Sequence, residues 1–364
     1  MGEIKTLIRD MRIYQATSSL SRPIADATHD ISKIAFYVLE VETEGGILGQ
    51  GYLLSFHYSP NAIEGAMKDL KRFVLERKYH VYETLQLQQD YEAESEYFGI
   101  PGLQRWALAT LNVALWDAWA RTLGQPIFRL FGCSRKKIPV YGSGGWISYT
   151  DEELLEEVKE YQKRGFQAVK IKVGSPDQER DVRRLHLVRE AIGPNMKIMM
   201  DANQGMDVPS SVSLIEQVKH LGIHWFEEPV SNTDFEGYAL IHQKTSISLA
   251  MGEREYSTVA LRELIGRRAL DLWQPDLIRL GGVEAWRDSA ALAAAYHIPV
   301  LPHYYKDYDI PLLVTVSRPY GAESFDWIDG IIDQPMEIVD GYALPREGEG
   351  WGFRFLHQYM TEVK

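Results

Sequence analysis

Hydrophobic and polar positions follow two different rhythms along this chain. In the first third, two short apolar-rich runs, residues 36–41 and 49–54, flank a Glu-Gly-Gly turn and predict a β-hairpin. Three later stretches, 61–76, 81–94 and most strongly 103–123, space their apolar residues three or four apart, which predicts helices. The chain therefore begins with an α+β unit.

From residue 138 onward, short apolar strands alternate with amphipathic helices. We expect eight strands, at residues 138–141, 168–173, 197–200, 224–227, 248–251, 270–273, 299–301 and 323–327. Helices are expected between several of them, at residues 152–164, 179–192, 210–221, 259–267 and 284–296. A repeated strand–helix pattern with eight strands predicts a parallel sheet closed into a barrel.

The rhythm is lost again over the last thirty or so residues, which are rich in glycine. We expect this segment to return to the first unit. The predicted domains are an α+β cap over residues 1–130, a catalytic barrel over 131–334 and a returning C-terminal segment over 335–364.

Composition narrows the class of protein. The chain of 364 residues is 45% apolar and 25% charged, as in soluble globular proteins, and no stretch approaches the roughly 20 apolar residues that span a bilayer. Charges interrupt the first fifteen residues, so no signal or transit peptide is expected and the predicted location is the cytoplasm. The net charge of −12 is spread along the chain and would repel nucleic acid. The single cysteine, Cys133, excludes an internal disulfide, and its apolar neighbours predict a buried thiol.

Ionisable and polar residues recur where the predicted barrel strands end. Active sites of such barrels lie at the C-terminal ends of the strands, so we expect these side chains to meet. In strand order they are Lys170 and Lys172, Asp201 and Asn203, Glu227 and Glu228, Glu253 and Arg254, Asp276, and His303.

Three carboxylates, those of Asp201, Glu227 and Glu253, come from three consecutive strands. Together they would repel one another without a cation, and oxygen-only ligands suit a hard ion, Mg²⁺ before Mn²⁺ or Ca²⁺. The alternative is a set of helix caps and strand-end salt bridges.

Two further pairs predict acid–base chemistry. Lys170 and Lys172 lie on the same side of one apolar strand, so each should lower the lysine pKa of the other toward neutrality and provide a general base. Asp276 and His303, from the next two strands after Glu253, are placed to hydrogen-bond, with the carboxylate orienting the imidazole.

These motifs resemble a known family over nearly the whole chain. The segment ALATLNVALWDAWARTLGQPIFRLFG, then KIKVG, MDANQG, WFEEPV, MGE, QPD and PH, in this order, are similar to the mandelate racemase subgroup of the enolase superfamily. The resemblance implies a modified TIM barrel, (β/α)7β, with an α+β capping domain, a Mg²⁺ cofactor and commonly a homo-oligomer. It also implies roles for individual residues: Lys172 and His303 as bases on opposite faces of the substrate, Lys170 and Asp276 as their partners, Asp201, Glu227 and Glu253 as metal ligands, and Asn203 near the substrate carboxylate.

One position departs from the pattern of the family. The subgroup often places a glutamate after the eighth strand to hydrogen-bond the ene-diolate oxygen, and here the expected candidates are Asp326 and Asp329, with Asp329 favoured.

The implied chemistry is Mg²⁺-dependent removal of the proton alpha to a carboxylate through an enediolate. Loss of a β-hydroxyl protonated by His303 would make the chain an acid-sugar dehydratase that forms a 2-keto-3-deoxy acid. Return of a proton to the opposite face would make it a racemase or epimerase, and a cycloisomerase is a related alternative. A non-catalytic binding protein on the same fold is the alternative of another class.

The expected substrate contacts lie in the cap and after the first strand. The loop over residues 17–32 is polar and includes Arg22 and His29, which suits a polyhydroxylated acid better than an aromatic one. Trp146, after a glycine-rich run, could form a wall of the pocket or simply pack.

Overall fold

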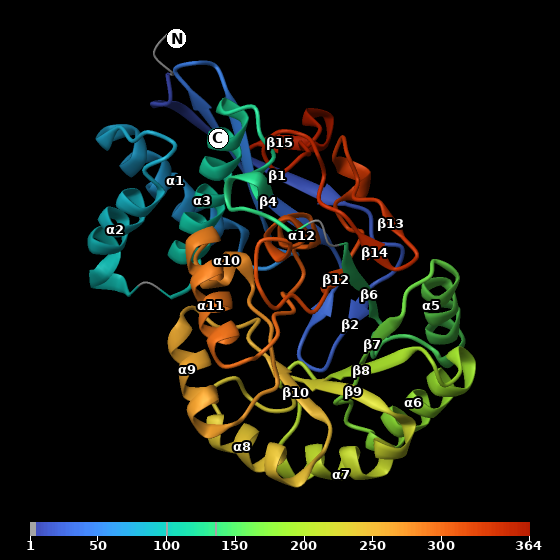
Figure 1. The fold of residues 1–364 in the computed structure, drawn as a ribbon. Coiled ribbons are helices and arrows are strands. Elements are labelled where there is room, and N and C mark those ends of the chain that lie inside the picture. Colours follow the sequence, from blue (N-terminus) through green and yellow to red (C-terminus); the bar gives the residue numbers. More distant parts are fainter. Residues whose placement is uncertain (1–4, 100, 135–136) are drawn as a thin grey trace.

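A computed structural model describes residues 5–99, 101–134 and 137–364. In its cap, one antiparallel sheet has the strand order β15-β1-β4-β5 (Figure 1). The expected hairpin is present as β4 (Ile34–Thr43) and β5 (Leu48–Leu54). The returning C-terminal segment contributes β15 (Met360–Glu362), which pairs with β1 (Ile8–Ser18). The cap is therefore built from both ends of the chain.

Strand β1 was not expected from the sequence. In its first half, charged side chains interrupt the buried Ile8, Met11 and Ile13: Arg9 is exposed, and Asp10 and Arg12 are half-buried. This alternation is that of a strand with one face toward solvent.

Three helices complete the cap, and all three were expected. They are α1 (Pro60–Arg77), α2 (Thr84–Ser95) and α3 (Leu103–Thr122). Helix α3 lies so close to β5 that a Cβ atom added at Gly51 would stand 2.2 Å from the carbonyl oxygen of Thr110, and one at Gly49 would stand 2.3 Å from that of Ala114. Glycine is required at both positions because the obstacle is helix backbone.

The barrel is closed by parallel pairing. Its strands are β6 (Ile138–Gly144), β7 (Ala168–Lys172), β8 (Lys197–Asp201), β9 (Ile223–Glu227), β10 (Ser248–Met251), β11 (Leu272–Trp273) and β12 (Ala322–Ser324). They pair in this order from β6 to β11, and β12 pairs with β6. The expected strand at 299–301 is present only as parallel bridges from Val300 to Trp273 and to Pro319, and these bridges close the ring.

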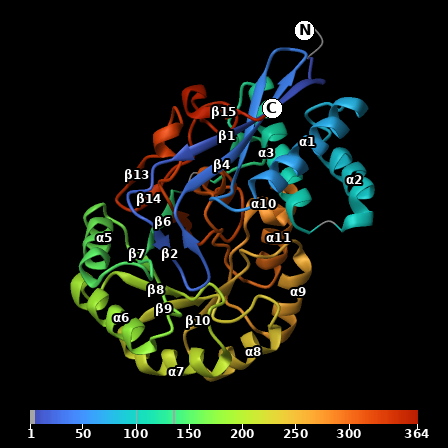
Figure 2. The same cartoon turned by 180° about the vertical axis from the view of Figure 1, so that it is seen from behind.

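Helices surround the strands, as Figures 1 and 2 show from opposite sides. They are α5 (Asp151–Lys163), α6 (Gln178–Ile192), α7 (Val208–Val218), α8 (Phe235–Lys244), α9 (Thr258–Arg267), α11 (Val283–Ala295) and α12 (Lys306–Leu313). The five expected barrel helices are confirmed, whereas α8 and α12 were not among them. Helix α12 contains Pro311 and two buried aspartates, which hide a helical pattern. The (β/α)7β barrel with an α+β cap is confirmed.

Apolar side chains fill the inside of the barrel below the C-terminal ends of the strands. One layer of buried side chains comes from six strand positions: Tyr141, Met199, Trp225, Ala250, Leu272 and Leu301. Met199 and Trp225 lie two residues before Asp201 and Glu227, so the period of two along a strand points these carboxylates inward above the apolar layer. The layer separates the charged end of the barrel from the opposite end.

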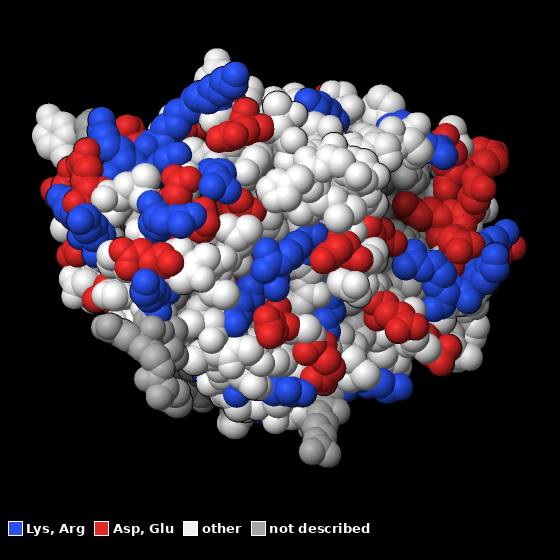
Figure 3. All heavy atoms as spheres, turned by 90° about the horizontal axis from the view of Figure 1, so that it is seen from above, with Lys and Arg blue, Asp and Glu red and all other residues white. Residues whose placement is uncertain are grey.

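The surface differs from expectation at one residue. Cys133 is exposed, so the prediction of a buried thiol is wrong: its apolar neighbours Leu130 and Phe131 pack against the core while half-buried, and the cysteine does not. On the face in Figure 3, acidic and basic side chains are interspersed rather than gathered by sign. Among the described helices, none combines the length and apolar character that crossing a membrane requires.

The close packing of α3 on β5 can be tested with two glycines of the cap. We expect Gly51→Ala to lower the free energy of unfolding by about 3 kcal/mol, because the methyl group meets backbone that cannot move aside. Gly65→Ala is the control: this exposed position in α1 has no atom within 4 Å of the added Cβ, and alanine should stabilise the helix by about 0.5–1 kcal/mol. Denaturant titration measures both, and equal effects would contradict the packing.

Candidate active site

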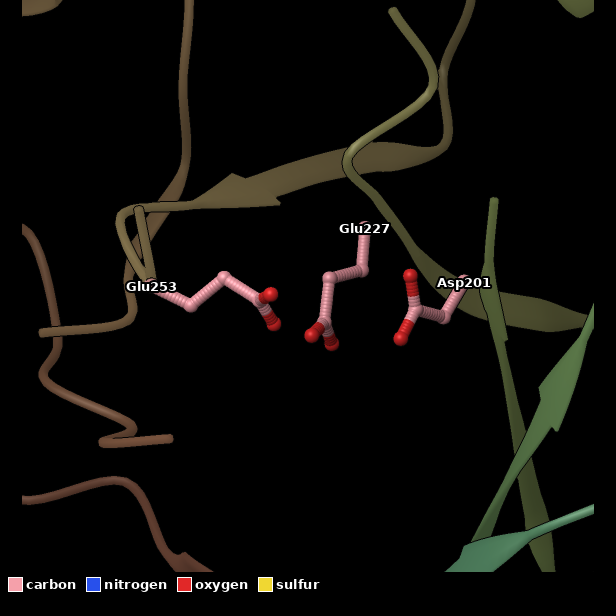
Figure 4. Close-up of side chains that lie close together, drawn as sticks. All are labelled: Asp201, Glu227 and Glu253. Carbon is pink, nitrogen blue, oxygen red and sulfur yellow. The ribbon is translucent and has the colours of Figure 1, made fainter. Parts of the chain in front are cut away.

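Three buried carboxylates meet at the C-terminal end of the barrel (Figure 4). Asp201 ends β8, Glu227 ends β9, and Glu253 follows β10 by two residues. One oxygen from each lies within 4.8 Å of the others. Glu227 lies between the other two, so the carboxylates form a row (Figure 4).

Close to each of these carboxylates, one residue has a positive φ angle: it lies two positions after Asp201, one position after Glu227 and one position before Glu253. Asn203 and Glu228 have φ angles of 42° and 39°, in the left-handed region, and Gly252 has a φ of 139°. A Cβ at Gly252 would stand 2.8 Å from the Trp273 ring. Such backbone conformations are held in place by the surrounding structure and are common at active sites.

Lys170 and Lys172 enter this row from β7. The Lys170 Nζ lies 2.8 Å from Glu227 Oε1, 3.4 Å from Asp201 Oδ2 and 2.6 Å from Glu323 Oε1. The Lys172 Nζ donates to Asp201 Oδ2 at 2.6 Å. Both lysines are buried, as expected.

The predicted direction of the lysine pKa shift is wrong in this structure. Burial acts to lower the pKa of Lys172, and Lys170 lowers it further, but the carboxylates of Asp201, Asp26 and Glu227 together outweigh both and the pKa is raised. Burial likewise opposes the charge of Lys170, whose pKa is raised well above its usual value by Glu227 and Glu323. The sequence showed the neighbouring ammonium group, whereas the carboxylates come from other strands.

His303 and Asp276 form the expected pair. The two side chains share a hydrogen bond of 2.8 Å between Nδ1 and Oδ2. The other Asp276 oxygen accepts the backbone N–H groups of Ile278 and Arg279, at 2.9 and 2.8 Å. The imidazole Nε2 is left facing Glu253 Oε2 at 3.4 Å. Burial acts to lower the pKa of His303, but Glu253 and Asp276 raise it above its usual value.

Glu323 is a site residue that the sequence reasoning missed. This glutamate of β12 accepts hydrogen bonds from Ser143 Oγ at 2.6 Å and from the Tyr304 backbone N–H at 2.9 Å, besides its contact with Lys170. Burial would raise its pKa, but Lys170 and His303 lower it to about 2. A glutamate inside a short apolar strand was the available signal, but it was read as the start of that strand.

The two expected candidates for this position lie elsewhere. Asp329 accepts a hydrogen bond from Lys306 at 2.8 Å, and Asp326 pairs with Arg164 at 3.0 Å. Neither lines the cavity. Among these three acids, only Glu323 lines the cavity, and it lies within the strand and not after it.

These groups open into a cavity of about 360 Å³ between the barrel and the cap. Among the expected substrate contacts, Asn203, His29 and Trp146 line it. Arg22 does not: its guanidinium pairs with Glu153 of α5. The loop is long enough to reach the site, but this side chain turns to the barrel helix instead.

The donor set fits a hard divalent cation. The three carboxylates supply oxygen ligands only, and within the described residues their neighbours leave three buried oxygens without a hydrogen-bond partner: Asn203 Oδ1, Glu228 Oε1 and Gln274 Oε1. Glu228 is held through its other oxygen by Arg254 at 3.0 Å. Oxygen ligands in this number, with room for water, suit Mg²⁺.

Comparison with known families agrees with this geometry. Residues 153–359 match the enolase C-terminal domain-like family, and residues 8–132 match the N-terminal domain of mandelate racemase / muconate lactonizing enzyme. This chain belongs to the mandelate racemase group of the enolase superfamily.

Relatives within this superfamily cover almost the whole chain. L-talarate/galactarate dehydratase of Salmonella typhimurium is 27% identical over 355 residues, covering 96% of this chain and 89% of the relative. D-galactarolactone cycloisomerase of Agrobacterium fabrum is 27% identical over 378 residues, covering 98% of each. The crystal structure of the Salmonella dehydratase liganded with Mg and L-lyxarohydroxamate has a TM-score of 0.92 at 25% identity, covering 98% of this chain and 94% of that one.

Cation binding by the carboxylate row can be measured directly. We expect Glu227→Gln to weaken Mg²⁺ binding by at least about tenfold in calorimetry, because the central ligand loses its charge. Glu255→Gln is the matched control, since Glu255 accepts a hydrogen bond from Asn232 at 3.0 Å and is not part of the row. Unchanged affinity in Glu227→Gln would remove the row as the binding site.

Substitution of Glu323 and of Asp329 tests which of the two acids is needed for activity. We expect Glu323→Gln to reduce turnover at least about a hundredfold, because the variant removes the negative charge that pairs with Lys170 and so misplaces the lysines beside the substrate. Asp329→Asn should retain most activity, because its partner Lys306 lies outside the cavity lining. Circular dichroism would confirm that both variants fold. The reverse order of activities would restore Asp329 to the site.

Proposed function

We propose that this chain is a Mg²⁺-dependent enzyme that removes the proton alpha to a carboxylate, and that its reaction is the dehydration of an acid sugar to a 2-keto-3-deoxy acid. One observation carries the proposal: the two candidate bases flank opposite ends of the carboxylate row. Lys172 contacts Asp201 at one end, and His303 faces Glu253 at the other. Both also line the cavity.

This placement suits a substrate whose alpha carbon lies between the two bases. Lys172 would take the alpha proton from one face in its neutral form, which a cation held by the row would favour by offsetting the charge of Asp201. Lys170 beside it adds positive charge where negative charge develops. His303, held by Asp276, would deliver a proton from the other side to the departing β-hydroxyl, which leaves as water. The resulting enol tautomerises to the 2-keto acid.

Glu323 and the three carboxylates of the row would bind the oxygen atoms of the substrate and the cation. Glu323 is fixed by Ser143 and the Tyr304 backbone, and its position in the cavity lining allows it to contact the substrate oxygen on that side. Asp201, Glu227 and Glu253 would hold Mg²⁺, which supplies Lewis-acid neutralisation of the substrate carboxylate.

The relatives support this chemistry. One is named for dehydration of talarate and galactarate, and a structure of that enzyme holds Mg with an acid-sugar analogue. A second candidate, an isomerase reaction, is favoured by the similarity to a galactarolactone cycloisomerase, and in this chain it would depend on the same two bases. A non-catalytic role does not explain why bases, partners and ligands are all present. We further propose cytoplasmic residence and a homo-oligomer.

The two bases predict separate defects. We expect Lys172→Ala and His303→Asn each to abolish turnover of acid sugars, with losses of about a hundred- to ten-thousand-fold. The histidine variant should still exchange the alpha proton in deuterated water, because Lys172 remains, but should not release water. Proton NMR and a 2-keto-acid assay measure the two events.

A histidine far from the cavity gives the matched control. His220→Asn changes an exposed residue of the barrel exterior and should leave both exchange and dehydration intact. Full turnover by either Lys172→Ala or His303→Asn would remove that residue from the mechanism. Inversion of the alpha centre by the unmodified enzyme, without a keto acid, would favour the isomerase.

A further inference from the structure

The cations that line the cavity, within the described part of the chain, all have acidic partners. Lys172 pairs with Asp201 at 2.6 Å, Arg254 with Glu228 at 3.0 Å, Arg279 with Glu253 at 3.6 Å, His303 with Asp276 at 2.8 Å, and His29 with Asp26 at 3.2 Å. None of these pairs leaves a cation whose charge is free for a second anionic group of a substrate.

The cap loop does not add one. Its expected arginine, Arg22, pairs with Glu153 and stacks 5.3 Å from the centre of the Tyr149 ring, outside the cavity lining. The loop presents Asp26 to the cavity, and this carboxylate keeps a lowered pKa, against the effect of burial, through His29 and Lys172. Negative charge therefore faces the space above Lys172.

One wall of the cavity is a continuous aromatic cluster. Phe325 and Trp327 stack with centroids 4.3 Å apart, Trp146 lies 6.1 and 6.2 Å from them, and Tyr304 lies 5.8 and 5.6 Å from them. The cluster begins beside the catalytic end, where the Trp146 ring lies 5.3 Å from the Lys172 Nζ. At its other end, Phe56 of the cap lies 5.6 Å from Trp327. All five side chains line the cavity.

The cap adds a second apolar surface. Leu54, Ile63, Leu103 and Trp106 line the same cavity from the hairpin and the helices α1 and α3. Uncharged, hydrogen-bonding groups also line the cavity: Asn203 follows β8 at the catalytic end, and Ser55 and Ser59 lie between β5 and α1 in the cap. A ligand that fits this distribution carries charge at one end only.

From this distribution we propose that the substrate is a polyhydroxylated monocarboxylic acid with an apolar far end, such as a methyl group, and not a diacid. The inference rests on the proposed function, since it assumes that the single carboxylate lies at the carboxylate row. A second carboxylate would lose its hydration against aromatic side chains without a cation to pair with, which is costly. In this respect the chain differs from the relative named for galactarate, a diacid.

The test uses matched sets of acids with the same configuration at C2 to C5. Each set contains a hexarate, a hexonate and a 6-deoxyhexonate, which differ only in the group at C6: carboxylate, hydroxymethyl or methyl. Calorimetry on the Mg²⁺-loaded protein measures binding, and alpha-proton exchange in deuterated water measures removal of the alpha proton. For the best configuration, we expect the 6-deoxyhexonate to bind tightest and the hexarate to bind at least about a hundredfold more weakly.

The two readouts separate the inference from the proposed function. Selective binding of the 6-deoxyhexonate without exchange of any acid would refute the proposed function and leave the inference standing. Exchange of hexarate and 6-deoxyhexonate with similar efficiency would overturn the inference and leave the function standing. Absence of binding by every set would overturn both.

A substitution in the aromatic wall tests whether these side chains cause the preference for an apolar group at C6. Trp327 is half-buried and has no part in the proton transfers, so Trp327→Ala should reduce the preference for methyl over hydroxymethyl at C6 about tenfold. Trp327→Phe keeps an aromatic face and should retain most of the preference. Equal preference in the unmodified protein and in Trp327→Ala would show that this wall does not contact the C6 end of the substrate.

Discussion

Repulsion among three buried carboxylates is the constraint on which the rest of this structure depends. Asp201, Glu227 and Glu253 lie within reach of one ion and are almost completely buried, so water screens their charges little. Burial and the neighbouring Asp201 raise the pKa of Glu227 to about 7, whereas His303 and Arg254, against the effect of burial, hold the pKa of Glu253 well below its usual value. The charge is compensated only because lysines, arginines and a histidine from other strands converge on the same row.

That convergence is a product of the fold. Parallel pairing from β6 to β11 brings six strand ends to one side, and the apolar layer beneath them fixes which side chains point inward. The cap then covers this charged end with apolar and aromatic side chains, so substrate binding and charge compensation occur in one enclosed space. Neither part could form the cavity alone.

Much of the site could be predicted because it lies at strand ends. The period of two and the C-terminal position placed Lys172, Asp201 and Asp276 correctly from local sequence. Properties that depend on packing between distant segments could not be predicted. They are the approach of the carboxylates that raise the lysine pKa, the pairing of Arg22 with Glu153, and the exposure of Cys133. Glu323 could be predicted only in part. Its strand was expected from the sequence, but the inward direction of its side chain depends on pairing with β6.

The most direct measurement is a crystal structure of the protein soaked with Mn²⁺ and an acid-sugar ligand, with data collected for anomalous scattering. We expect one strong anomalous peak within bonding distance of an oxygen from each of Asp201, Glu227 and Glu253, and the alpha carbon of the ligand between Lys172 and His303. An anomalous peak at another position, or none at saturating Mn²⁺, would contradict the central claim that this row of carboxylates exists to hold a cation beside two opposed bases.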